Sequence, residues 1–196
     1  MEIKISKELK ERCPRAALLV ICYEAEVAES SQGLLDLRNK QVDQLRDTYT
    51  MAAIAEIPHI RDTREAYLSL GKSPSKYRNA SEAMLRRIVK GNGLYNINNV
   101  VEINNLISVS TGYSIGSYEV DCLEGEVAWQ RAPEGECYQG IGKDQVNIEF
   151  LPTLYDGQGA FGNPTSDSQR AMIRPGKRHI ASVIYSFSGK DEFETI

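Results

Sequence analysis

The sequence is poor in the residues that usually build metal sites and nucleophilic triads. It has only two histidines and four cysteines among 196 residues. Neither His59 nor His179 lies beside a nucleophile, so the spacing gives no support for a hydrolytic triad. No two cysteines form a C-x-x-C pair and no histidine pair accompanies them, which argues against a zinc site. The cysteines are Cys13, Cys22, Cys122 and Cys137. We expect no metal and no organic cofactor.

Long apolar runs and targeting segments are also missing. The longest apolar run, roughly residues 16–22, is far shorter than the about 20 residues that a membrane helix needs. With no secretory leader visible, a cytoplasmic setting with reduced cysteines is expected. The formal net charge of −4 argues against a general polyanion binder, although a local basic patch remains compatible with it. An apolar fraction of 41% and a charged fraction of 26% are typical of a soluble globular protein.

The order of the patterns predicts an α+β fold in one domain, residues 1–196. An apolar, β-branched run at 17–23 predicts a buried strand, and residues 34–57 and 61–70 have helical periodicity. Pro58 ends or restarts the first helix, and Gly71 caps the second. Further helices are expected after an N-terminal cap at Asn79 and at residues 99–109. Four strands are then expected, at residues 126–131, 146–154, 171–174 and 181–187.

A cluster of cationic side chains lies between positions 72 and 90, where only Glu82 opposes them. Such a patch is suited to binding nucleic-acid phosphates. The alternative is a solvated helix face, and the spacing alone favours that alternative. The six cations are Lys72, Lys76, Arg78, Arg86, Arg87 and Lys90.

Three further segments combine polar side chains with small residues. Asn104 and Asn105 end an asparagine-rich stretch that caps and turns do not easily explain, and their amides suit either a polar ligand or a structural hydrogen-bond network. Residues 111–119 are interpreted as a loop in which Gly112 and Gly116 permit close approach, with an ordinary loop as the alternative. Residues 157–170 collect glycines and hydroxyls, with Asp167 and Arg170 expected to pair. The alternative there is a turn-rich hairpin connection.

Five segments, taken in order, resemble a known family. They are residues 81–87, 97–105, 112–119, 124–131 and 133–136. Together they resemble the B3/B4 domain of the β subunit of phenylalanyl-tRNA synthetase, over residues 72–187. Residues 1–71 resemble the helical lead-in of free-standing B3/B4 proteins. The resemblance implies a domain that receives the 3′ end of tRNA and hydrolyses a wrongly attached tyrosine, because binding alone separates similar side chains poorly.

The family's site residues carry over only in part. Its Thr-Asn pair falls on Asn104 and Asn105, and its Phe-Asp pair on Tyr118 and Glu119. The editing histidine falls on Gly116, and the glutamate of the late strand has no equivalent in residues 180–185. Glycine supplies no donor or acceptor side chain, so hydrolysis by the family's constellation is not expected.

Three hypotheses follow. In the first, the chain binds the aminoacyl end of a tRNA, or a similar aminoacyl ligand, and any reaction is ester hydrolysis by water. The phosphate contacts would be Arg86, Arg87 and Lys90. The pocket would be lined by Asn104, Asn105, Gly112, Gly116, Tyr118, Glu119 and Gly162. In the second, the chain is a non-catalytic binding module for an amino-acid-like small molecule. In the third, it is a structural domain in which side chains fill the space between Asn105 and Gly116.

Overall fold

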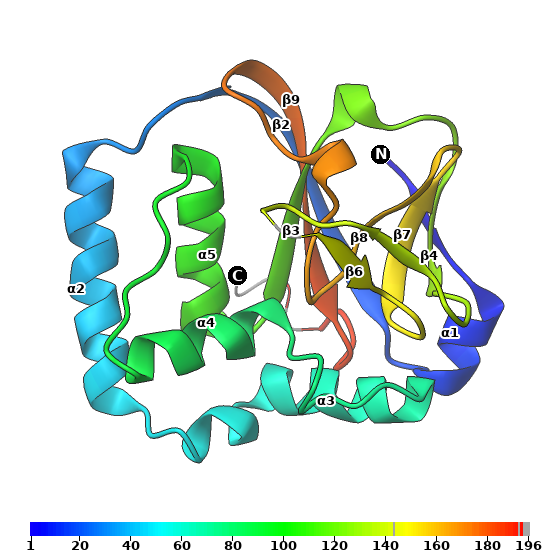
Figure 1. The fold of residues 1–196 in the computed structure, drawn as a ribbon, viewed down its shortest axis with the longest axis horizontal. Coiled ribbons are helices and arrows are strands. Elements are labelled where there is room, and N and C mark those ends of the chain that lie inside the picture. The colour runs from blue at the N-terminus through cyan, green and yellow to red at the C-terminus, as the bar shows by residue number, and fades with distance from the viewer. Residues whose placement is uncertain (143, 192, 194–196) are drawn as a thin grey trace.

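A computed structural model describes residues 1–142, 144–191 and 193, and it confirms the predicted α+β class (Figure 1). The helices are α1 (Lys7–Arg12), α2 (Gln32–Thr48), α3 (Pro58–Leu70), α4 (Ala80–Val89) and α5 (Asn99–Thr111), with short 3₁₀ turns η1 (Ala53–Glu56), η2 (Val120–Cys122) and η3 (Gln169–Ala171). The strands are β1 (Ile3–Ile5), β2 (Ala17–Val27), β3 (Ser114–Glu119), β4 (Val127–Arg131), β5 (Cys137–Gln139), β6 (Gln145–Asn147), β7 (Pro152–Asp156), β8 (Gly159–Gly162) and β9 (Gly176–Ser186).

The strands form two main sheets that face each other across an aromatic core. One sheet has the order β2-β9-β3 and is antiparallel, and the other has the order β1-β4-β7-β8. A small hairpin of β5 and β6 forms a third sheet, and its Tyr138 and Val146 pack in one apolar cluster with Tyr155 and Ala160 of the second sheet. Trp129, Tyr118, Phe161 and Tyr185 fill the space between the sheets and are almost fully buried. Helices α2, α4 and α5 lie beside the β2-β9-β3 sheet, whereas α3 runs below both sheets toward α1 (Figure 1).

Local sequence signals set the helix ends as expected. Asn79 caps α4 by accepting a hydrogen bond from the Glu82 amide at 2.8 Å. Pro58 occupies the first turn of α3, and Gly71 ends that helix at φ +89°, a conformation that glycine adopts without strain. Among the described residues, no helix is long and apolar enough to cross a membrane.

Four predicted elements differ in the structure. The helix predicted at 34–57 ends at Thr48, where Tyr49 turns to an extended conformation. The strand predicted at 146–154 is two strands, because Phe150 adopts φ +64° between them. Residues 171–174 form no strand: Ala171 is the last residue of the 3₁₀ turn η3, and residues 172–174 have no regular secondary structure. The apolar run at 17–23 belongs to an edge strand, so Ile21 is 47% exposed rather than buried.

The sequence pattern predicts a loop at residues 111–119, but most of this segment forms β3. Two glycines and five serine, threonine or tyrosine residues hide the alternation of apolar and polar side chains that would indicate a strand in this segment. Pairing with β9 supplies the backbone hydrogen bonds of the strand. The first 71 residues also contribute β1 and β2 in addition to helices, and both strands are hydrogen-bonded to later segments.

Candidate functional site

The predicted pocket residues lie on opposite faces of β3. Side chains alternate along a strand, so Gly116 and Tyr118 face the second sheet while Ser117 faces α5. On the helical side, the Asn104 amide donates hydrogen bonds to the hydroxyls of Ser117 and Ser182. The structure therefore separates Asn104 from Gly116 instead of bringing them into one pocket.

Tyr118 fills the space above Gly116. A Cβ atom added to Gly116 or to Gly162 would lie 2.1 Å from the Tyr118 hydroxyl oxygen. Tyr118 itself has no exposed surface. Both glycines thus let a tyrosine ring approach the backbone, and a ligand would have to displace that ring to reach them. The third hypothesis, a structural domain, predicts that side chains fill the space next to Gly116, as Tyr118 does here.

The Tyr118 hydroxyl belongs to a buried polar cluster. It donates a hydrogen bond to Asp167 Oδ1 at 2.7 Å and lies 2.6 Å from the Tyr185 hydroxyl. Burial raises the pKa of Asp167 to about 7, although the hydrogen bond from Tyr118 opposes this shift. The expected pair between Asp167 and Arg170 is absent, because Arg170 binds Asp156 at 2.8 Å. We call Tyr118, Asp167 and Tyr185 the Asp167 cluster.

Stability should fall with rising pH because of Asp167. The unfolded carboxyl loses its proton near about pH 3.9, whereas the folded one keeps it to about pH 7. The proton bound only by the folded state stabilises it fully below about pH 4, and this contribution is lost as the pH rises through about 7. Urea unfolding followed by fluorescence of the single tryptophan, Trp129, measures the effect.

The control is Asp167→Asn, which keeps an acceptor for Tyr118 but does not titrate. As the pH rises from about 4 to about 8, the free energy of unfolding of the wild type should fall relative to that of the variant. A difference that stays constant across this range contradicts the assignment.

An open pocket lies beside the Asp167 cluster, and we call it the outer pocket. Its volume is about 360 Å³. It is lined by Glu136, Cys137, Tyr138, Gln139, Gln158, Gly159, Ala160, Ser168 and Arg170. Ser168 is only 2% exposed, and its hydroxyl has no hydrogen-bond partner within the described residues. A buried hydroxyl without a partner is unfavourable, so this wall is suited to a polar ligand.

Other side chains hold the walls of the outer pocket in place. The Asn163 amide donates to the Tyr138 hydroxyl at 2.9 Å, and the Tyr138 hydroxyl donates to the backbone oxygen of Ser166. Burial raises the pKa of Tyr138, which keeps its hydroxyl protonated. Arg170 donates to both carboxylate oxygens of Asp156 and is thereby anchored. The pocket therefore has a fixed polar wall.

The predicted phosphate contacts are largely engaged within the protein. Glu82 has no exposed surface and accepts hydrogen bonds from Arg64, at 3.0 Å to each oxygen, and from Arg86 at 2.8 Å. Arg78 lies 3.8 Å from the same carboxylate. Arg87 donates to the Gly93 backbone oxygen at 2.7 Å. The guanidinium of Arg86 is thus engaged in neutralising the buried carboxylate of Glu82.

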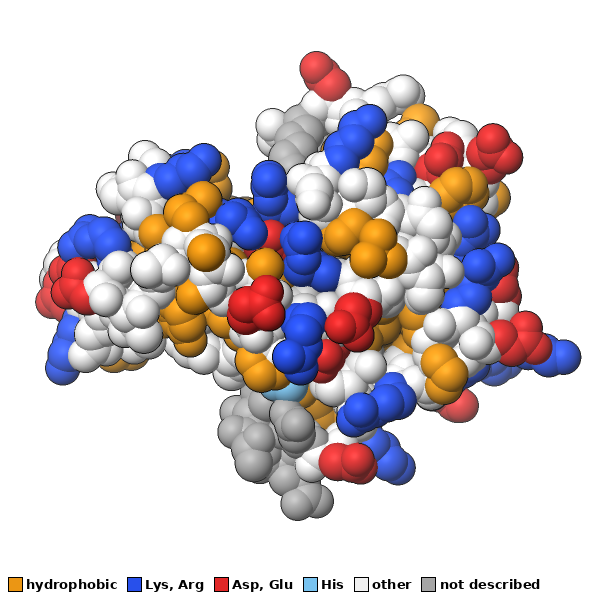
Figure 2. Space-filling model, turned by 90° about the horizontal axis from the view of Figure 1, so that it is seen from below, with side chains coloured by type: hydrophobic (Ala, Val, Ile, Leu, Met, Phe, Trp, Pro, Cys, Tyr) orange, Lys and Arg blue, Asp and Glu red, His pale blue; other side chains and the backbone are white. Residues whose placement is uncertain are grey.

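The lysines of this stretch divide into buried and exposed members. Lys72 is 5% exposed and donates to Asn147 Oδ1 at 2.6 Å, and burial lowers its pKa. Lys76 and Lys90 are exposed. Basic side chains gather near the middle of the described part of the face in Figure 2, with acidic side chains among and beside them.

The remaining predicted residues have local structural contacts. Gly112 ends α5 at φ +85°, and a Cβ atom there would lie 2.9 Å from Ile57 Cγ2. Glu119 is 7% exposed and lies within 4 Å of two arginines, Arg174 at 3.8 Å and Arg178 at 3.5 Å. Asn105 is half-buried on α5.

Sequence reasoning missed Tyr138, Ser168 and Tyr185. These residues come from three separate strands and turns, and no spacing links them. Of the three, only Ser168 lies in a segment that the sequence singles out, residues 157–170. Within residues 1–142, 144–191 and 193, no three His, Cys, Asp or Glu side chains are placed to hold a metal ion.

Comparison with known proteins finds a matching family and similar solved structures. The family model described as "B3/4 domain" matches residues 62–187. A crystal structure of an N-terminal fragment of the phenylalanyl-tRNA synthetase β subunit from Pyrococcus horikoshii is similar, with a TM-score of 0.42 and 13% sequence identity. The similarity covers 95% of this chain and 45% of that one, so this chain spans less than half of its length. No curated protein matches the sequence.

Proposed function

This chain belongs to the B3/4 domain family, and from that premise we propose that it binds an aminoacyl group, without hydrolysing it, in the outer pocket. The unpartnered hydroxyl of Ser168, buried in the pocket wall, carries the proposal. An aminoacyl group offers a carbonyl oxygen as an acceptor for that hydroxyl. Its ammonium group would be matched by the carboxylate of Glu136, which also lines the pocket.

The dimensions of the outer pocket support a small ligand. A volume of about 360 Å³ falls at the lower end of the range for small-molecule sites, about 300–1,000 Å³. The anchored guanidinium of Arg170, which donates to the Gly159 backbone oxygen at 3.1 Å, supplies a polar part of its lining. Binding of one aminoacyl group with part of its ribose is consistent with this size.

The chemistry at the predicted editing position supports binding rather than hydrolysis. Gly116 has no side chain to position water, and Tyr118 covers it. The carboxyl of Asp167, with a pKa of about 7, is hydrogen-bonded to Tyr118. It is therefore engaged within the core instead of being presented to a ligand.

Replacement of Ser168 by alanine should weaken ligand binding about 5- to 15-fold, the equivalent of one neutral hydrogen bond. The probes are non-hydrolysable 3′-aminoacylamino-3′-deoxyadenosines carrying each of the common side chains, titrated by calorimetry. The variant should be at least as stable to urea as wild type, because the buried hydroxyl that it loses makes no internal hydrogen bond.

The matched control is Ser75→Ala, an exposed serine in the turn before α4, which should bind like wild type. Failure of wild type to bind any member of the probe set rejects the proposal. Release of amino acid from a mischarged tRNA would instead show that the domain is a deacylase.

A second candidate function, binding of a whole aminoacyl-tRNA, is favoured by the exposed cations Lys76 and Lys90. It differs from the first in its salt dependence. Phosphate contacts make affinity fall steeply with salt, whereas a small ligand in the outer pocket is bound nearly independently of it. Comparing aminoacylated tRNA with the nucleoside probes over a salt series separates the two.

A further inference from the structure

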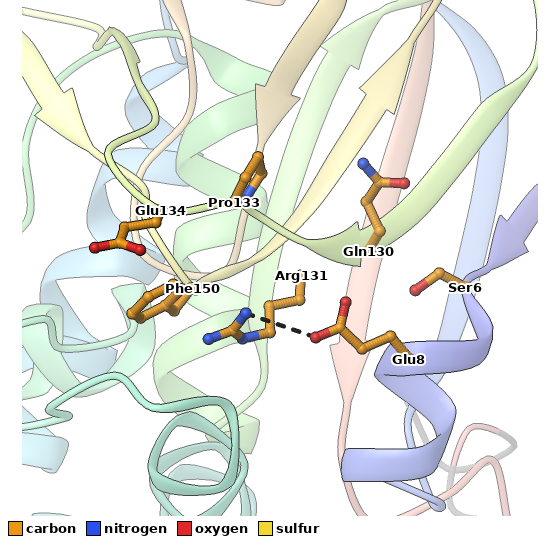
Figure 3. A pocket seen from close by; sticks show the side chains of 7 residues that line it. All are labelled: Ser6, Glu8, Gln130, Arg131, Pro133, Glu134 and Phe150. Carbon is orange, nitrogen blue, oxygen red and sulfur yellow. Dashed lines mark ion pairs between the residues drawn. The ribbon is translucent and has the colours of Figure 1, made fainter.

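A second hollow of about 610 Å³ lies at the far end of β4, and we call it the Arg131 pocket (Figure 3). It is lined by Ser6, Glu8, Gln130, Arg131, Pro133, Glu134 and Phe150. It shares no residue with the outer pocket. In Figure 3 the Arg131 guanidinium lies near the middle of the hollow, with Glu8 on one side and Glu134 on the other.

The Arg131 guanidinium is held in place but retains donors for a ligand. Its Nε donates to the Leu70 backbone oxygen at 2.8 Å, and its centre lies 3.9 Å above the Phe150 ring. Its Nη1 is 3.6 Å from Glu8 Oε1, which is too long for a hydrogen bond. No hydrogen bond from the Nη atoms is formed to another described residue. A fixed guanidinium with free paired donors is suited to a carboxylate.

Phe150 forms the floor of this hollow in a strained backbone conformation. It is the only non-glycine residue with positive φ among those described, at +64°. A bulky side chain in the left-handed region costs about 1–2 kcal/mol. The Phe150 amide donates to the Ala132 oxygen and the Ala132 amide to the Leu151 oxygen, both at 2.9 Å, and these bonds hold the turn. Such strain is concentrated at ligand sites, and here it places the ring under Arg131.

The charges of the Arg131 pocket select the ligand class. One guanidinium and two carboxylates, Glu8 and Glu134, would repel a simple anion but complement a zwitterion. Glu8 also lies 3.3 Å from Arg12, so Glu134 is the carboxylate more available to a ligand. We propose that the Arg131 pocket binds a free α-amino acid, with its carboxylate on Arg131 and its ammonium on Glu134. Pro133 and Phe150 provide an apolar surface for the side chain.

Binding is tested by titrating the full chain with each of the 20 common L-amino acids, followed by NMR chemical shifts. We expect at least one of them to shift the amides around Arg131 and Phe150. If leucine binds, for example, 3-methylbutylamine and 4-methylpentanoate lack its carboxylate and its ammonium, respectively. Each deaminated or decarboxylated analogue should bind at least about tenfold more weakly than its parent.

Two variants keep the test decisive. Glu134→Gln changes an exposed side chain and should weaken the amino acid about tenfold while leaving the carboxylate-only analogue unaffected or improved. Arg131→Lys should weaken both. Glu29→Gln, an exposed carboxylate outside the pocket, is the matched control and should change neither.

No shift with any amino acid overturns the proposal, as does equal binding of a parent and both of its analogues. The outcome is independent of the outer pocket, because Ser168→Ala should leave this binding unchanged. If Ser168→Ala abolished binding of both the aminoacyl probes and the free amino acid, the two ligands would share one site, which would contradict a separate Arg131 pocket.

Discussion

Replacing Glu82 with glutamine is expected to lower the free energy of unfolding by about 3–5 kcal/mol. Glu82 has no exposed surface, and its carboxylate accepts hydrogen bonds from Arg64 and Arg86, with Arg78 nearby. Removing its negative charge leaves guanidinium groups facing one another across a partly dry space. Because Arg64 and Arg86 retain some access to water, with side chains 24% and 21% exposed, the lower end of the range is expected. Urea unfolding measures the loss.

The control is Glu11→Gln. Glu11 pairs with Lys7 at 3.6 Å, four residues apart on α1, and both side chains are largely exposed. An exposed pair of this kind contributes less than about 0.5 kcal/mol. If the Glu82→Gln and Glu11→Gln variants lose the same unfolding free energy, the buried Glu82 carboxylate does not neutralise Arg64 and Arg86 to the extent proposed. The same experiment bears on RNA binding, because freed arginines would increase the salt-dependent affinity of the variant for tRNA.

Replacing Tyr118 with alanine should cost about 3–5 kcal/mol, the usual range for emptying an aromatic site in a core. The ring packs edge-on against Phe161 at 5.0 Å between centroids and lies over two glycines. Gly162→Ala alone should cost about 1–3 kcal/mol, because its Cβ would collide with the Tyr118 hydroxyl. Both losses are measured by urea unfolding.

The double variant gives the sharper result. With Tyr118 reduced to alanine, the added Cβ at position 162 meets no ring, so its cost should nearly vanish and the two changes should couple by about 1–3 kcal/mol. Gly33→Ala serves as the control, since a Cβ there meets nothing within 4 Å. Additive losses of stability at Tyr118 and Gly162 would contradict the close packing of the Tyr118 ring on Gly162.

The single variant Tyr118→Ala also opens the position predicted for an editing pocket, so its binding of the aminoacyl probes can be compared with wild type.

Local signals in the sequence predicted the helical half well. The cap at Asn79, the proline at the start of α3 and the glycine that ends it are each short-range chemistry, and the structure confirms all three. The α+β class followed from the order of helical and strand-like periods. These features depend on a few neighbouring residues, which is why one sequence was sufficient to predict them.

The candidate site could not be predicted in the same way, because it depends on which face of β3 each side chain takes. Interpreting residues 111–119 as a loop hid the alternation that separates Asn104 from Gly116. A strand assignment would have placed Gly116 with Tyr118 and away from Ser117. The Asp167 cluster joins three strands or turns that only pairing through β9 brings together. The neutralisation of the arginines by Glu82 likewise required α3 to lie beside α4.

The arrangement of β9 has a consequence for where the domain can be cut. This strand lies between β2 and β3 and pairs with β2 along all eleven of its residues, from Gly176 to Ser186. The family match begins at residue 62, well after β2. A fragment trimmed to the matched region would leave one side of β9 with unsatisfied amides and carbonyls and a newly bared apolar surface. The unpaired edge of β9 would pair with other chains, so such a fragment is expected to aggregate. The smallest fragment that folds should therefore include β2.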